Sequence, residues 1–319
     1  MSTKSLETGN PGSGKLGKSL ARDWRLYVML ILPLAFYIIF CYKPMTGIVI
    51  AFQNFQLTNG ISGSPYVGLE NFAFVMRQGG PFWPALWNTL LLNVMGLIAG
   101  FPVPIILAIM LNEVRSSSIK RVSQTMLYLP HFLSWIIIGG MVLALFQPTT
   151  GVVNALLLKW GWIDESIPFL VEGWPWRIMY TVIGIWQSMG WGTILYLSAI
   201  TGINMELFEA AKIDGANKMQ QIWHVTLPGI RGTIVILLIL NIGQMMNISF
   251  DKPQVLLNPK VLDYGDVLST YVYRVAFPSG SNGRFDRSTA IGLFQSVVGL
   301  ILVSTANFVT NRLGEDGIW

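Results

Sequence analysis

Six apolar stretches separated by polar segments dominate the pattern of this chain. A helix that crosses the hydrocarbon core of a bilayer needs about 17–25 mainly apolar residues. Six stretches meet this requirement and are the predicted spans: Leu26–Tyr42, Leu86–Leu111, Met126–Phe146, Ile178–Ile200, Thr233–Phe250 and Ala290–Val309. The pattern therefore predicts an all-α, polytopic membrane protein with six transmembrane helices in a single domain of residues 26–319.

The segments around these spans have a different character. Residues 1–25 are polar and rich in Gly, Ser and Lys, which predicts a flexible tail. No cleavage site of small residues follows a short apolar core, so we expect the first span to be retained. The apolar stretch Val152–Ile163 is too short to span and is predicted to lie at the membrane interface. Pro102 and Pro104 predict a kink in the second span, because neighbouring helices can satisfy the freed carbonyls.

Composition supports a membrane protein. Of the 319 residues, 52% are hydrophobic and 12% are charged, whereas soluble domains carry roughly 25% charged residues. The mean hydropathy is +0.53. The single cysteine excludes an intrachain disulfide. These values argue against a large soluble core.

The distribution of positive charge predicts the orientation. More than half of the 21 Lys and Arg fall in the tail, in the two even-numbered connections and after the last span, namely in residues 1–25, 112–125, 201–232 and 310–319. Cytoplasmic loops carry such an excess, so both termini are predicted to be cytoplasmic. The basic residues are dispersed along loops, which argues against a nucleic-acid surface.

The polar connection 201–232 predicts two short helices. Asn204 is a good N-cap, and Gly215 is placed to end a helix of about ten residues in a left-handed turn. Asn217 and Gln220 have the spacing of a capping box that begins a second helix. The first helix would carry an apolar edge beside small alanines, which suits a cleft in another protein. An ordinary surface connector would show the same pattern.

A motif in this connection resembles that of a known family. It reads Glu-Ala-Ala, three residues, Gly, nine residues, a hydrophobic residue, any residue, Leu-Pro. Its members here are Glu209, Ala210, Ala211, Gly215, Val225, Leu227 and Pro228. The motif resembles the signature of inner-membrane permeases of binding-protein-dependent ABC importers, which often have Ile where Val225 stands. The stretches Tyr42-Lys43-Pro44-Met45 and Gly68-Leu69-Glu70-Asn71-Phe72 resemble the oligosaccharide and polysaccharide permeases of that family.

The resemblance implies a type I permease fold and a role in ATP-driven import of an oligosaccharide or polysaccharide fragment, such as an alginate or pectin fragment. The expected location is the bacterial cytoplasmic (inner) membrane, where the chain forms half of the pathway. The implied partners are a second homologous permease, two ATPase subunits that bind ATP and Mg²⁺, and an extracytoplasmic solute-binding protein. The implied ATPase-coupling residues are Glu209, Ala210, Ala211, Asp214, Gly215, Leu227 and Pro228.

Residues 9–16 nearly match a phosphate-binding loop, but Leu16 stands where Mg²⁺ needs a hydroxyl. We therefore expect no nucleotide on this chain. No metal motif and no pairing of a nucleophile with a base is visible, so the sequence favours a transport protein over an enzyme. His131 and His224 are interpreted as packing or backbone-bonding residues.

Polar and aromatic side chains in the last three spans predict the substrate pathway. Saccharides bind through amide hydrogen bonds and through stacking on aromatic rings. The candidates are Trp186, Gln187, Trp191, Tyr196, Asn241, Gln244, Asn247 and Gln295. Hydrogen bonds between helices would explain the same residues, and Asn93 is interpreted as structural. No charged residue is predicted in mid-membrane, which argues against the alternative of an autonomous secondary sugar carrier not coupled to ATP.

Overall fold

The computed structural model describes residues 23–278, 283–312, 314 and 317. The predicted flexible tail, residues 1–25, therefore lies almost entirely outside the described residues. Within the described part of the chain the regular structure is helical, apart from one isolated bridge between Gln53 and Tyr66.

The first two spans are longer than predicted. The first runs unbroken from Trp24 to Phe52. It comprises α2 (Trp24–Phe36), a π turn (Tyr37–Tyr42), α3 (Lys43–Met45) and a 3-10 turn (Thr46–Phe52). After α4 (Gly60–Gly63) and α5 (Glu70–Val75), the second span consists of α6 (Phe82–Gly100) and α7 (Pro102–Glu113). Phe101 joins them with helical backbone angles, so the two prolines leave the span continuous.

The predicted third span, Met126–Phe146, is wrong as a single straight helix. It consists of α8 (Ser117–Tyr128), a 3-10 turn (Leu129–Phe132) and α9 (Trp135–Phe146), with a bend of 98°. Pro130 lacks an amide hydrogen for a helical bond. Ser134 accepts a hydrogen bond from the Ile137 amide and so begins a new helix. The short α10 (Val152–Lys159) follows.

The fourth span is α11 (Gly173–Thr201), and the polar connection after it contains α12 (Met205–Ile213), α13 (Lys218–Gln221), a π turn (Ile222–Thr226) and α14 (Leu227–Gly229). The fifth span, α15 (Arg231–Gly243), ends seven residues before the predicted Phe250. Gly243 packs tightly on the last helix, since an added Cβ would lie 2.3 Å from Val303 Cγ2. Residues 244–246 form a turn, and residues 247–250 continue without helical structure.

The connection between the predicted fifth and sixth spans, residues 251–289, is mostly helical. It contains α16 (Asp251–Leu256), a 3-10 turn (Pro259–Val261), α17 (Leu262–Gly265) and α18 (Leu268–Ala276). The last span, α19 (Phe285–Arg312), begins five residues earlier and ends three residues later than the predicted Ala290–Val309.

Three segments of the described chain are long and apolar enough to cross a membrane, and two bent helix pairs raise this to five when each pair counts as one span. The remaining predicted span coincides with α11, which has 29 residues. This length suffices for a bilayer. Its polar side chains lower its hydropathy.

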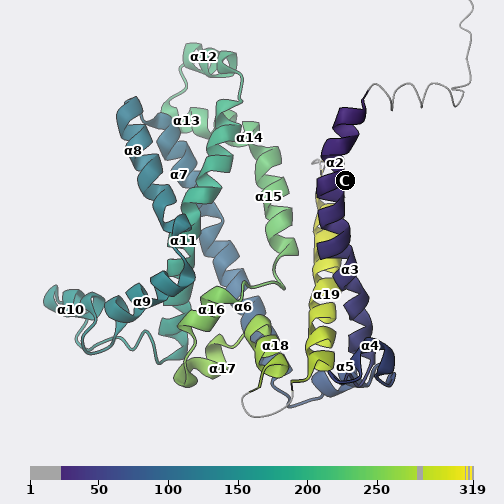
Figure 1. Cartoon of the computed structure of the whole chain (residues 1–319). Coiled ribbons are helices and arrows are strands. Elements are labelled where there is room, and N and C mark those ends of the chain that lie inside the picture. The colour runs from purple at the N-terminus through teal and green to yellow at the C-terminus, as the bar shows by residue number, and fades with distance from the viewer. Residues whose placement is uncertain (1–22, 279–282, 313, 315–316, 318–319) are drawn as a thin grey trace, which may run out of the picture.

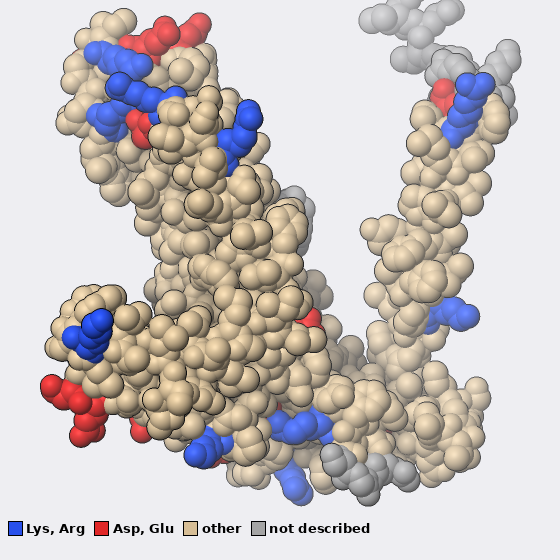
Figure 2. Space-filling view, turned by 60° about the vertical axis from the view of Figure 1, so that its left-hand side comes forward, with Lys and Arg blue, Asp and Glu red and all other residues tan. Residues whose placement is uncertain are grey.

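The two ends of the molecule differ in what they present. The start of α2, the α12–α14 connection and the end of α19 lie at one end, and α5, α17 and α18 lie at the other (Figure 1). Charged side chains gather at both ends, and the surface between them is almost free of charge (Figure 2). This is the distribution expected of a bundle whose middle faces lipid.

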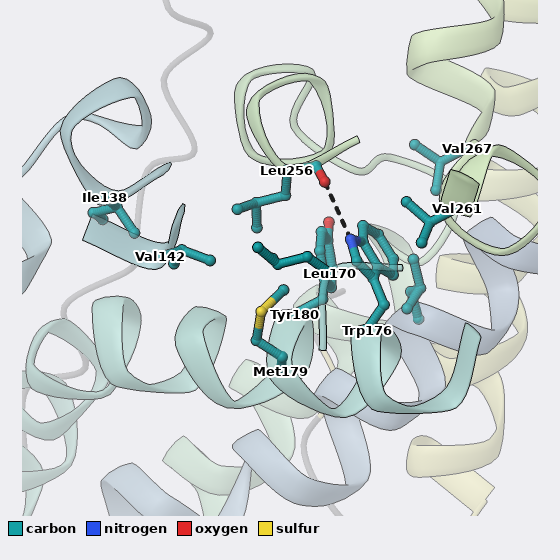
Figure 3. Close-up of a cluster of buried hydrophobic side chains, with 10 residues drawn as sticks. Ile138, Val142, Leu170, Trp176, Met179, Tyr180, Leu256, Val261 and Val267 are labelled. Atoms are coloured by element: carbon teal, nitrogen blue, oxygen red, sulfur yellow. Dashed lines mark hydrogen bonds between the residues drawn. The ribbon is translucent and has the colours of Figure 1, made fainter. Parts of the chain in front are cut away.

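A hydrophobic core fixes the end opposite α12. Trp176 of α11 is fully buried and donates a hydrogen bond from Nε1 to the Leu256 carbonyl oxygen at 3.1 Å. Val142 of α9 and Val261 join the same cluster (Figure 3). The cluster therefore ties α9, α11 and the α16–α17 segment together.

Candidate functional site

The helix α12 projects from one end of the bundle (Figure 1). None of its nine residues is buried. The Asn204 side chain accepts a hydrogen bond from the Glu206 amide at 3.0 Å, and Gly215 follows the helix with a φ of +79°. The predicted capped helix with its glycine stop is thereby confirmed, with nine residues against the ten or so expected.

The base of this projection is fixed to the bundle. The Asn217 amide donates to Gln220 Oε1 at 2.7 Å, and the Gln220 amide donates to Asn217 Oδ1 at 3.0 Å. This confirms the predicted capping box. Lys218 Nζ lies 2.7 Å from Glu113 Oε2 at the end of α7. The ion pair joins the start of α13, which follows α12, to the end of the second span.

The motif residues surround this connection. Glu209 and Ala210 are exposed on α12, and Leu227 and Pro228 lie in α14. Ala211, Asp214 and Gly215 line a hollow of about 300 Å³ together with Ala216, Gln220, His224 and Val225. The structure thus gathers the predicted coupling residues at one exposed end of the molecule. His224 Nδ1 lies 3.0 Å from the Gln220 carbonyl oxygen, as expected of a backbone-bonding histidine.

A cavity of about 550 Å³ lies among α6, α7, α11, α15 and the residues that follow α15. Six of the predicted pathway residues line it. They are Gln187, Trp191, Tyr196, Asn241, Gln244 and Asn247. Amides and aromatic rings therefore share one space, as the recognition of a saccharide requires.

The three amides of the fifth span and the residues after it reach the cavity from different kinds of backbone. Asn241, Gln244 and Asn247 have three-residue spacing, which suggests one helical face, but the helix ends at Gly243. The side-chain amide of Asn241 donates to the Leu237 carbonyl oxygen. Gln244 and Asn247 lie in the non-helical residues that follow. Asn241 therefore reaches the cavity from the last turn of α15, whereas Gln244 and Asn247 reach it from the residues after the helix.

Two other predicted pathway residues lie outside the cavity lining. Trp186 packs against the hydrophobic core of Figure 3, and Gln295 donates to the Met246 carbonyl oxygen at 3.0 Å. Asn93 donates to the neighbouring Met245 carbonyl oxygen at 2.7 Å and also lines the cavity. Gln295 and Asn93 thus hold the turn after α15 from two sides, which agrees with the structural interpretation of Asn93.

Lys252 is a cavity residue that the sequence pattern missed. The pattern places it in an outer loop, but its ammonium group lies 3.6 Å from the centroid of the Tyr180 ring and 5.5 Å from that of Trp135. It is the single charged residue among those that line the cavity. In α16, beyond the end of the fifth span, burial lowers the pKa of this amine. The predicted set of pathway residues therefore lacks the one charged residue that lines the cavity. The missed signal is the position of Lys252 a few residues after the amides Gln244 and Asn247.

Aromatic contacts shape the side of the cavity formed by α11. The His131 ring stacks on Trp191 with centroids 5.1 Å apart, and Gln187 Nε2 donates to the His131 carbonyl oxygen at 3.4 Å. Trp191 keeps about half of its surface exposed. The turn between α8 and α9 therefore holds one face of this indole and leaves the rest free.

Comparison with known proteins places this arrangement in a family. Residues 100–314 match the family of binding-protein-dependent transport system inner membrane components. The chain is 42% identical to the polygalacturonan/rhamnogalacturonan transport system permease protein YteP of Bacillus subtilis (strain 168), over 92% of this chain and 90% of that protein. It is 40% identical to the protein LplB of the same organism, over 94% and 93% of the two chains.

A solved structure shares the whole fold. A chain of a bacterial ABC transporter involved in the import of the acidic polysaccharide alginate superposes with a TM-score of 0.83 at 38% identity, over 93% of this chain and 99% of that one. A chain of a bacterial alginate ABC transporter in complex with an alginate pentasaccharide-bound periplasmic protein gives a TM-score of 0.84 at 38% identity, over 95% of this chain and 100% of that one. This confirms the predicted all-α fold of an ABC importer permease. The chain belongs to the family of binding-protein-dependent transport system inner membrane components.

Proposed function

We propose that this chain is one of the two permease subunits of an ATP-driven importer for an acidic oligosaccharide or polysaccharide fragment of the alginate or pectin type. The observation that carries the proposal is the pairing of a complete, exposed coupling motif with a cavity lined by amides and aromatic rings. The relatives named for polygalacturonan, rhamnogalacturonan and alginate transport support the choice of an acidic substrate.

A second permease is the proposed partner within the membrane. In the first span, the most apolar window has none of its residues buried in this chain. The span stands away from most of the bundle and contacts it mainly near its outer end (Figure 1). A homologous subunit packed against this face would complete the bundle and close the pathway on its open side.

The proposed energy source is a pair of ATPase subunits that bind ATP and Mg²⁺ at the end that carries α12. Both termini and the coupling loop would then be cytoplasmic, in the inner membrane, with a solute-binding protein docking at the other end. Glu209, Ala210, Ala211, Asp214, Gly215, Leu227 and Pro228 would form or support the contact with an ATPase. A ligand shifts a conformational equilibrium only by its differential affinity for the two states. Contacts of α12 with the ATPases would supply this difference.

The test of this assignment is a charge reversal on α12 in the assembled transporter. Glu209 is exposed, and its replacement by lysine leaves the bundle core unchanged. For Glu209→Lys we expect normal assembly in detergent together with a large loss of the ATP hydrolysis that substrate-loaded binding protein stimulates. Met219→Lys changes another exposed residue near the base of the connection and serves as the control. Wild-type stimulation in Glu209→Lys would overturn the coupling assignment.

A further inference from the structure

The cavity contains an ionisable amine without an anionic partner. Lys252 is the one charged residue of its lining, and none of the ion pairs among the described residues includes it. The adjacent Asp251 is exposed, and no ion pair joins it to Lys252 in the described structure. Removing an ammonium group from water costs several kcal/mol unless a partner compensates.

The neighbouring rings compensate this cost in part. The Tyr180 centroid lies 3.6 Å from Nζ and the Trp135 centroid lies 5.5 Å from it. A cation–π contact contributes about 0.5–2 kcal/mol. The rings therefore offset only part of that cost, and no carboxylate of the described residues pairs with Lys252 to offset the rest.

The backbone of α11 makes room for this ammonium group. A Cβ placed on Gly184 would lie 2.2 Å from Lys252 Nζ. Lys252 therefore reaches across to α11 and occupies the notch that this glycine leaves. Tyr180, Trp135 and Gly184 pack against the lysine at the cavity wall. Its ammonium group lies next to the open space of the cavity.

The position along the pathway is in the outer half of α11. Gly184 lies twelve residues before Tyr196, another lining residue nearer to the coupling end, which corresponds to about 18 Å of helix. A substrate that enters from the end opposite α12 would meet Lys252 before it meets Tyr196. Amide groups of Gln244 and Asn247 line the same cavity and can bond sugar hydroxyls.

We propose that Lys252 binds a carboxylate of the saccharide in the outer part of the cavity and thereby selects uronic acid residues over neutral sugars. This inference rests on the proposed function and adds the residue that determines specificity. A carboxylate is the anion that an acidic saccharide carries on every uronic acid ring, and it would supply the counter-ion that the site lacks. The amides and rings of the cavity would serve neutral and acidic sugars alike.

The experiment compares an oligogalacturonide with its methyl ester, which has the same rings and hydroxyls but no charge. Equilibrium binding is measured on the purified, assembled transporter without its solute-binding protein, so that the cavity alone discriminates. For the wild type we expect affinity for the acid to exceed that for the ester about tenfold, as one charge-assisted bond would produce. Lys252→Met should abolish this preference through weaker acid binding, and Lys252→Arg should preserve it.

Matched controls keep the outcomes distinct. Lys159→Met removes an exposed lysine of α10 and should bind both saccharides as the wild type does. A preference that survives in Lys252→Met would overturn the inference, as would an equal loss of both affinities in a variant that remains assembled. If Lys252→Met fails to assemble, Lys252→Gln and Lys252→Arg decide the same question, because an acid preference in the former or its loss in the latter contradicts the inference.

ATP-driven uptake by the wild type is measured in parallel. If uptake of both saccharides is absent, the proposed function fails, whereas uptake without a role for Lys252 removes this inference alone.

Discussion

Lys252 and Gly184 fit together as a side chain and its notch, since a Cβ on Gly184 would lie 2.2 Å from Lys252 Nζ. The contacted atom is the end of a flexible side chain, so a methyl group at Gly184 would displace the ammonium without opening the bundle. The position of the positive charge in the cavity therefore depends on a glycine of another helix.

Gly184→Ala should accordingly reduce binding of an oligogalacturonide by about tenfold and leave binding of the methyl ester nearly unchanged. Gly96→Ala is the matched control, because Gly96 lines the same cavity and nothing lies within 4 Å of the added Cβ. Both changes place alanine in a helix and favour its stability. If the two variants bound the oligogalacturonide equally well, the notch at Gly184 would have no effect on the position of the Lys252 ammonium group.

Gly215 ends α12 with a φ of +79°. A β-branched residue in this left-handed region costs about 1–2 kcal/mol, so Gly215→Val should shift the end of α12. We expect the ATP hydrolysis stimulated by the binding protein to fall by at least tenfold in the assembled transporter. Gly232→Val adds the same side chain at a site in α15 where nothing lies within 4 Å of a Cβ, and it should keep most of the stimulation. Equal stimulation in both valine variants would contradict this role of the turn.

The N-terminal cap of α12 allows a second test of the coupling role of this helix. Asn204→Ala removes the acceptor for the Glu206 amide and should cost about 1 kcal/mol of local helix stability. Asn204→Asp keeps an acceptor and should behave as the wild type. Amide hydrogen exchange over 205–213 measures the effect, with faster exchange expected in the alanine variant alone. Unchanged exchange would mean that packing, and not the cap, holds α12.

Arg177 stabilises the end of the bundle opposite α12. Its Nη2 donates to Asn88 Oδ1 at 2.7 Å and its Nε to the Tyr264 carbonyl oxygen at 3.3 Å. Asn88 in turn donates to the carbonyl oxygens of Asp263 and Asp266. Arg177→Met removes the donor to these buried groups and should lower the free energy of unfolding by about 2 kcal/mol. We expect thermal unfolding in detergent to begin several degrees lower, whereas Arg121→Met, on the exposed α8, should unfold as the wild type does.

Most of the spans could be predicted from hydropathy, because a bilayer requires about twenty apolar residues for each helix. The caps and the glycine stop of the connection could be predicted as well, since each depends on a few adjacent residues. The bend between α8 and α9 was harder to predict from the sequence. Pro130 and Ser134 are visible in the sequence, but inside a bundle neighbouring groups determine whether a proline kinks a helix or ends it.

The cavity could be predicted in part. Its amides and rings stand out because polar groups in apolar spans are unusual. The role of Lys252 depends on where the chain goes after α15. An early end at Gly243 returns the following turns to the bundle, and close packing of Gly243 against α19 produces that end. Such a contact between distant segments leaves no periodic signal in the sequence.

The most direct test of the whole account is uptake of a labelled oligogalacturonide by proteoliposomes that contain the assembled transporter. The account predicts accumulation when ATP and Mg²⁺ are supplied at the side of α12 and the loaded solute-binding protein at the other, and none when any of these is omitted. The same vesicles with Glu209→Lys should accumulate little. Accumulation driven by an ion gradient without ATP would contradict the account and would identify an autonomous carrier.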